Sequence, residues 1–394
     1  MIFFRRLLGE GFRVFFLLAG LYGMVVMLAW EGWLGTGALG AVSPGVTPSY
    51  WHAHEMIFGY ATAAIGGFFL TAVPNWTGAK AARHVFIGTA AAIWLAGRIA
   101  MWFAGNASPM LVAVIDLAFI PVLGAKIATQ LIRRPKPQNM MFLGLLALIW
   151  IGNLMVHLEW LGLTDDSLQR GLRVGLLGLI SMIAVLGGRV TPAFTRNAMK
   201  RAGVPESRFP FSRRPVEITA VAGTILTAVL VLFSAPGLAI GIVAILAGVA
   251  QFLRLTGWRT GWTLDQPILW SLHLGVAMLG AGEILFGLAA LGVGDEVAAL
   301  HVLGIGAVGG MTLAVMSRAA LGHSGRALIA PRPMAVGYGL MALASVTRWA
   351  APTLFQQSYV PALMISGALW IAAFALFLWA IGPALTGPRM GRDG

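Results

Sequence analysis

Cysteine is absent from this chain of 394 residues, and charged side chains are scarce. Without thiols the chain cannot form a disulfide, a thiolate-bound metal site, a thiolate-ligated iron–sulfur cluster or a cysteine nucleophile. Charged residues make up 10% of the chain, whereas soluble proteins carry roughly a quarter. With 58% hydrophobic residues and a mean hydropathy of +0.84, the composition predicts an integral membrane protein.

Acidic residues are the scarcer of the charged kinds, with 14 Asp and Glu against 27 Lys and Arg and a net charge of +13. A strongly basic chain can indicate a nucleic-acid partner. Here the basic residues lie in loops between apolar segments, where they act as orientation signals. We therefore expect a lipid bilayer and no nucleic acid as the partner.

Twelve apolar segments are long enough to cross about 30 Å of hydrocarbon. They lie near residues 12–30, 51–73, 84–104, 109–132, 139–161, 172–194, 216–234, 236–255, 267–291, 296–317, 333–350 and 359–384. Basic residues group in alternate loops, which predicts that both termini are cytoplasmic. The predicted fold is all-α, a single polytopic membrane domain over residues 1–394 with about twelve transmembrane helices.

A glycine pair recurs at almost equal spacing along the chain, at 66–67, 187–188 and 309–310. In the predicted topology each pair lies near the cytoplasmic end of its helix. Three parallel four-helix repeats, with boundaries at 1–138, 139–262 and 263–394, would produce this pattern. The alternative is that glycine pairs recur because they allow close helix packing.

Ionisable residues inside the apolar segments gather towards the outer side of the predicted membrane. The residues placed there are His52, His54, His157, His301, Glu55, Asp116, Glu283 and Arg98. Such groups cost several kcal/mol in hydrocarbon unless a metal, a charge partner or a water-filled cavity compensates them. The pattern therefore indicates a functional site rather than membrane anchoring alone.

Neutral imidazole is the usual protein ligand of haem iron and of copper, so the outer histidines predict a metal centre. His273, in the cytoplasmic half of its helix, is a further candidate ligand. His52 and His54 would point about 200° apart on a regular helix, so they are expected to serve different sites unless the helix start is irregular. The alternative is that these histidines only anchor helix ends.

Arginines and carboxylates complete the candidate site. Arg98 and Arg173 are candidates for neutralising haem propionates, and the alternative for Arg98 is snorkelling to the interface. Glu55 and Glu283 are the candidate catalytic residues, which would deliver protons or orient a ligand histidine through its second ring nitrogen.

Several long motifs resemble the NnrS family of bacterial nitric-oxide-response membrane proteins. They are residues 52–59 (HAHEMIFG), 70–78 (LTAVPNWTG), 94–98 (WLAGR), 188–197 (GRVTPAFTRN), 269–275 (LWSLHLG) and 311–326 (MTLAVMSRAALGHSGR). Ser324 stands where the family usually has Thr. The resemblance spans nearly the whole chain.

The resemblance implies a multi-pass protein of the bacterial inner membrane that carries haem b and copper. It also implies protection from nitric oxide during denitrification or nitrosative stress, without assigning ligands to particular residues. We predict an oxidoreductase that binds nitric oxide and reduces it to nitrous oxide, with electrons from quinol or a separate donor. The alternatives are a non-catalytic haem/copper sensor or metal-homeostasis protein, and a secondary transporter.

A weaker, fold-level likeness connects the predicted topology to the catalytic subunits of haem–copper oxidases and nitric oxide reductases. In that superfamily histidines on helices 2 and 10 hold haem, as His52 or His54 and His301 would here. The second metal there is held largely by histidines of helices 6 and 7, and this chain has none in either segment. A second metal would therefore need His157, His273 or another geometry.

Overall fold

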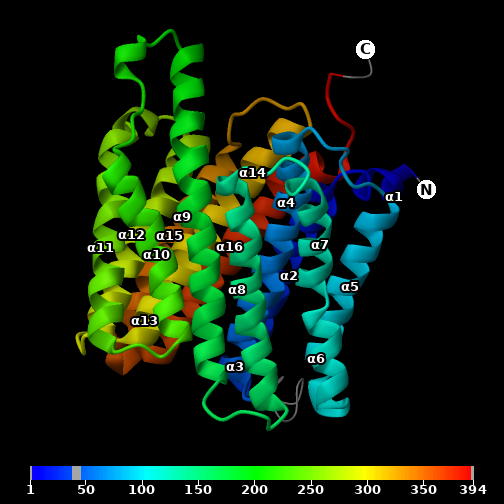
Figure 1. The fold of residues 1–394 in the computed structure, drawn as a ribbon, viewed down its shortest axis with the longest axis vertical. Coiled ribbons are helices and arrows are strands. Elements are labelled where there is room, and N and C mark those ends of the chain that lie inside the picture. The colour runs from blue at the N-terminus through cyan, green and yellow to red at the C-terminus, as the bar shows by residue number, and fades with distance from the viewer. Residues whose placement is uncertain (1, 38–45, 392–394) are drawn as a thin grey trace. The chain divides into compact units, whose positions relative to one another are not determined.

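The computed structural model describes residues 2–37 and 46–391, and within these ranges every regular element is a helix (Figure 1). Eleven helical runs in the described residues are long and apolar enough to cross a membrane. The predicted segment 333–350 forms a further helix that is not among those eleven. The all-α, multi-pass prediction is confirmed, while the cytoplasmic placement of the termini stays a prediction.

The chain divides into two compact units. The first comprises residues 1–175, 316–327 and 374–394, and the second comprises residues 176–315 and 328–373. The division into three repeats stays a prediction. Three helices contribute residues to both units: α9 (Leu168–Arg201), α14 (Gly310–His323) and α16 (Tyr359–Thr386).

The remaining helices of the first unit follow the predicted segments closely. They are α1 (Ile2–Leu7), α2 (Gly11–Thr36), α3 (Pro48–His54), the π-helix η1 (Glu55–Tyr60), α4 (Ala61–Thr77), α5 (Val85–Trp102), the 3₁₀ turn η2 (Ala104–Asn106), α6 (Pro109–Leu117), α7 (Phe119–Leu131) and α8 (Pro137–Trp160). Proline stands in the first turn of α3, α6 and α8, where its missing N–H leaves no bond unmade. Gly37 and Gly78 end α2 and α4 in left-handed conformation.

The break between α6 and α7 has a local cause. Pro121 has no N–H to bond the carbonyl of Leu117 four residues earlier. The indole Nε1 of Trp150, on α8, donates to this carbonyl at 3.0 Å instead. The break therefore ties α6 to α8 one residue from Asp116.

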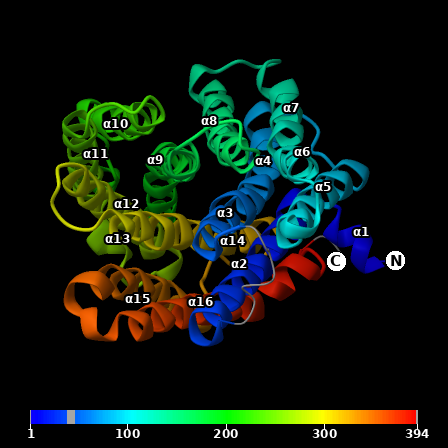
Figure 2. The ribbon, with the colours of Figure 1, turned by 90° about the horizontal axis from the view of Figure 1, so that it is seen from below.

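The second unit contains the later helices. They are η3 (Glu206–Arg208), α10 (Arg214–Leu232), α11 (Gly237–Gly257), η4 (Thr260–Thr263), α12 (Pro267–Ala290), α13 (Glu296–His301), the π-helix η5 (Val302–Gly309), α15 (Arg332–Leu354) and η6 (Gln356–Ser358). Helices α10, α11 and α12 lie side by side (Figures 1 and 2).

Close packing of α11 on α12 depends on glycine. A Cβ built on Gly248 would lie 2.6 Å from the carbonyl oxygen of Gly280, and one built on Gly287 would lie 2.7 Å from that of Gly241. Membrane helices approach this closely where small residues face one another, because lipid provides no hydrophobic drive for association.

Gly248→Ala should therefore lower the free energy of unfolding by about 1–3 kcal/mol, since backbone atoms cannot give way to the added methyl group. Gly339→Ala on α15 is the matched control, because no heavy atom lies within 4 Å of its Cβ position. Thermal unfolding of both variants in detergent measures the difference. Equal melting temperatures would contradict the role given to the glycine contact.

Candidate metal centre

A short α-helix followed by a π-helix positions the two central side chains of the first unit. His54 ends α3 and Glu55 begins η1, and both side chains are completely buried. Nδ1 of His54 lies 2.8 Å from Oε1 of Glu55. Because a carboxylate only accepts hydrogen bonds, Nδ1 carries the proton of this contact.

Arg98, on α5, joins two buried carboxylates. Its Nη1 donates to Oε1 of Glu55 at 2.6 Å, and its Nη2 donates to Oδ1 of Asp116 on α6. Gly59 leaves room for the guanidinium, since a Cβ there would lie 2.8 Å from Nη1 of Arg98. Both terminal nitrogens of Arg98, predicted for a haem propionate, are thus engaged by protein carboxylates.

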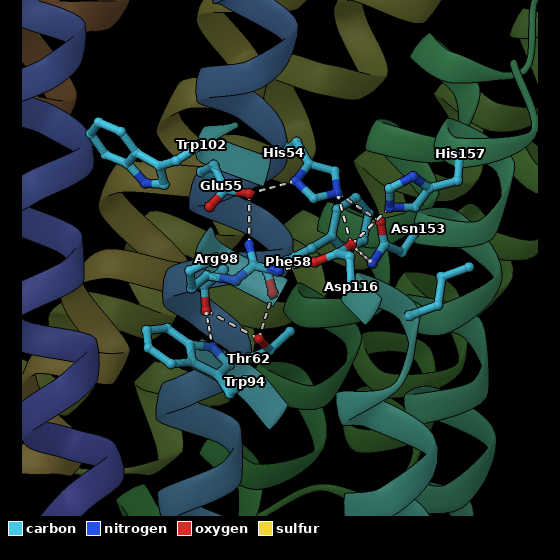
Figure 3. Close-up of polar contacts among 12 residues, drawn as sticks. His54, Glu55, Phe58, Thr62, Trp94, Arg98, Trp102, Asp116, Asn153 and His157 are labelled. Carbon is cyan, nitrogen blue, oxygen red and sulfur yellow. Dashed lines mark hydrogen bonds and ion pairs between the residues drawn. The ribbon is translucent and has the colours of Figure 1, made fainter. Parts of the chain in front are cut away.

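The other oxygen of Asp116 faces α8 and His54 (Figure 3). Oδ2 of Asp116 accepts from Nδ2 of Asn153 at 2.8 Å and lies 2.9 Å from Nε2 of His157. Nε2 of His54 lies 3.3 Å from the same oxygen and 2.8 Å from Oδ1 of Asn153. Ligand atoms of His54, Asp116 and His157 all lie within 4.8 Å of one another, as a metal site requires.

Lone pairs converge at Nε2 of His54. A neutral imidazole with its proton on Nδ1 presents a lone pair at Nε2, where it meets the acceptor oxygens of Asn153 and Asp116. Turning the Asn153 amide over relieves the contact with His54 but sets Oδ1 against Oδ2 of Asp116. A positive charge on Nε2, either a proton or a metal ion, resolves the conflict with the amide in the orientation that the structure has.

The formal charge of the cluster leads to the same conclusion. Glu55 and Asp116 bring two negative charges, and Arg98 brings one positive charge. With neutral histidines the buried group carries one uncompensated negative charge, which is costly away from water. One monovalent cation neutralises it.

An aromatic pair extends the network beyond Glu55. The hydroxyl of Tyr22, on α2, donates to Oε2 of Glu55. The same hydroxyl accepts from the indole Nε1 of Trp102 at 3.0 Å. Tyr22 therefore provides an ionisable hydroxyl that is linked to His54 through a single carboxylate.

The remaining predicted residues of the first unit lie elsewhere. His52 and His54 are both within regular α3 and face different neighbours, as expected for a regular helix. The ring of His52 stacks on Trp30 with centroids 4.5 Å apart. Arg173 lies half-buried on α9. Their proposed cofactor roles stay predictions.

Three predicted residues belong to the second unit. Both ring nitrogens of buried His273 are hydrogen-bonded at 2.9 Å, to the hydroxyls of Thr195 and Thr260. His301 places Nδ1 2.7 Å from the carbonyl oxygen of Val297 in its own helix. Oε1 of Glu283 contacts the hydroxyl of Thr224. Their assignments as ligands or catalytic groups also stay predictions.

Sequence reasoning placed Asp116 at the outer side without assigning it a role, and it missed Asn153. Asn153 and His157 are four residues apart on α8, so they share one helix face. That spacing was the available signal for a polar face directed at Asp116.

Comparison with known proteins supports the resemblance seen in the motifs. The NnrS family model, described as NnrS protein, matches residues 6–389, nearly the whole chain. No curated protein matches the sequence. Family membership supports a part in the response to nitric oxide and is consistent with metal binding at the cluster of His54, Asp116 and His157. The chain belongs to the NnrS family of nitric-oxide-response membrane proteins.

Proposed function

We propose that this protein binds copper through His54, Asp116 and His157, carries haem b, and reduces nitric oxide to nitrous oxide at the bacterial inner membrane, with both termini cytoplasmic. The convergence of two acceptor oxygens, from Asn153 and Asp116, on the lone pair of Nε2 of His54 carries the proposal. A cation would relieve this contact between acceptors, and the neighbouring donors are ones that metals bind.

The donor set suits copper. Two imidazoles and one carboxylate surround the point, and imidazole is a good copper ligand. The charge of the cuprous ion is the single positive charge that neutralises the cluster. Bound copper would supply a redox-active Lewis acid for nitric oxide.

The surrounding side chains have distinct roles in this proposal. Glu55 holds the Nδ1 proton of His54, which fixes the ring and strengthens Nε2 as a donor. Arg98 keeps Glu55 and Asp116 charged and in place. The hydroxyl of Tyr22 donates its proton to Glu55, so this pair would supply protons to the reaction. Burial of all these groups excludes bulk water.

Haem b would be held by His301, in the second unit. Donation from Nδ1 to the carbonyl of Val297 leaves the lone pair on Nε2, the arrangement of a ligand imidazole. Helix α15 packs against α13 and carries Arg348, whose buried Nη1 has no hydrogen-bond partner in the described part of the chain. A propionate carboxylate would satisfy this nitrogen. Haem would supply an iron centre that binds nitric oxide and holds an electron.

Metal and haem analysis of the purified protein tests the proposal together with nitric oxide consumption. Joining two nitric oxide molecules consumes two electrons and two protons and releases nitrous oxide and water, with quinol or another donor providing the electrons. We expect stoichiometric copper, a Soret band and quinol-dependent consumption. Haem and copper without turnover would support a sensor or metal-homeostasis protein, and absence of both would support a transporter.

His157→Gln should reduce the copper content of purified protein to a small fraction of the wild-type value, because one of three ligands is lost. His84→Gln is the control, since His84 is exposed at the start of α5. Copper is measured by elemental analysis after the two variants are purified in parallel. Equal copper in both variants would exclude His157 as a ligand.

A further inference from the structure

A second buried polar network crosses α10, α11 and α12 within the second unit. Its central member is Glu283 on α12, which is 2% exposed. Oε1 of Glu283 contacts the hydroxyl of Thr224 on α10, and Nε2 of Gln251 on α11 donates to that hydroxyl at 3.3 Å. Oε2 of Glu283 has no hydrogen-bond partner in the ranges that the structure describes.

The nearby Arg254 forms its ion pair with a different carboxylate, that of Glu217. Nη2 of Arg254 donates to Oε2 of Glu217 at 2.8 Å. Nη1 of Arg254 donates to Gln251 at 2.7 Å and to the carbonyl of Ala184 at 3.0 Å. The guanidinium also lies over the ring of Trp258, 4.8 Å from its centroid. Its charge is therefore matched by Glu217.

An ionised Glu283 would add an unmatched negative charge to this network. Burying an isolated carboxylate away from water is so costly that such groups take up a proton instead. Protonation also suits the hydrogen bonds around Thr224. A protonated Oε1 donates to the threonine hydroxyl, which accepts from Gln251 as well and donates its own proton to the carbonyl of Ala220 at 2.7 Å.

We propose that Glu283 binds and releases a proton within the membrane. The proton enters and leaves at the end of the network where Glu217 lies. The polar side chains continue in that direction, and the side chain of Glu217 is 26% exposed. Release moves one proton from the Glu283 carboxyl to water and transfers no electron. The hydroxyl of Thr224 then turns from Ala220 to the carboxylate of Glu283. This site does not depend on the proposed copper centre.

Infrared spectroscopy of the full-length protein in lipid tests the proposal directly. The carbonyl stretch of a protonated carboxyl should be present at neutral pH, shift in D₂O and be lost in Glu283→Gln. Retention of the whole protonated-carboxyl signal in Glu283→Gln would overturn the proposal. Copper and nitric oxide are not measured in this experiment, so its outcome is separate from that of the proposed function.

Thr224→Val provides a second test that leaves Glu283 in place. Losing the hydroxyl should shift the carbonyl band and slow its exchange with D₂O by about tenfold, the equivalent of one hydrogen bond. Thr227→Val is the matched control, because among the residues that the structure describes the hydroxyl of Thr227 bonds only the carbonyl of Gly223, at 2.9 Å in its own helix. The same band and exchange rate in both variants would exclude Thr224 from the route.

Discussion

Arg98→Gln should lower the free energy of unfolding by about 3–5 kcal/mol, the range measured when one partner of a buried ion pair is removed. Arg98 is 3% exposed, and it is the group that donates to both Glu55 and Asp116. Without it the two carboxylates would share a buried space with no fixed cation between them. Thermal unfolding in detergent, at constant pH and copper concentration, measures the effect.

Two further variants make this result specific. Arg83→Gln removes an exposed arginine from the loop before α5, so it should change stability very little. Arg98→Lys keeps the charge but loses the two-pronged geometry, so it should recover only part of the loss. If Arg98→Gln and Arg83→Gln unfolded at the same temperature, the ion network would have no structural role.

Asp116→Asn should weaken copper binding by more than about 100-fold, beyond the 10–100-fold typical for residues outside the ligand set. The substitution removes an oxygen of the proposed ligand set and also the uncompensated negative charge of the cluster. Asparagine keeps the shape of the side chain, which favours a folded protein. Copper titration of the metal-free variant measures the affinity.

Glu55→Gln separates the effect of losing a negative charge from the effect of losing the Asp116 oxygen. It removes the same charge but leaves the three ligand side chains, so copper binding should weaken by roughly 10–100-fold only. Asp165→Asn, in the exposed loop before α9, is the control for loss of an acidic residue. Wild-type copper affinity in Asp116→Asn would exclude Asp116 as a copper ligand.

The two buried networks have the same balance of charged groups. Each has one arginine and two carboxylates: Arg98 with Glu55 and Asp116, and Arg254 with Glu217 near Glu283. Each therefore leaves one negative charge to be neutralised. In the first unit His54, Asp116 and His157 bring together donor atoms that suit the proposed copper ion, whereas in the second a lone carboxyl next to a hydroxyl suits a proton.

Composition and hydropathy were enough to predict the fold class and to locate the helices. The predicted segment 84–104 is Val85–Trp102 in the structure, and 139–161 is Pro137–Trp160. Such agreement is expected because an isolated apolar helix in lipid must satisfy its own backbone hydrogen bonds, so length and hydropathy nearly suffice to locate it. The long motifs likewise identified the family without any structure.

Which polar groups meet could not be predicted before the packing of the helices was known. His52 and His54 are two residues apart, yet His52 stacks on Trp30 while His54 joins Asp116 and His157. Hydropathy does not specify how each helix is rotated about its axis or which neighbour it faces. Those are set by packing, as where Gly97 allows α5 to approach Asp116 and Trp150 holds the break after Leu117. The site therefore arises from contacts between helices that are distant in the chain.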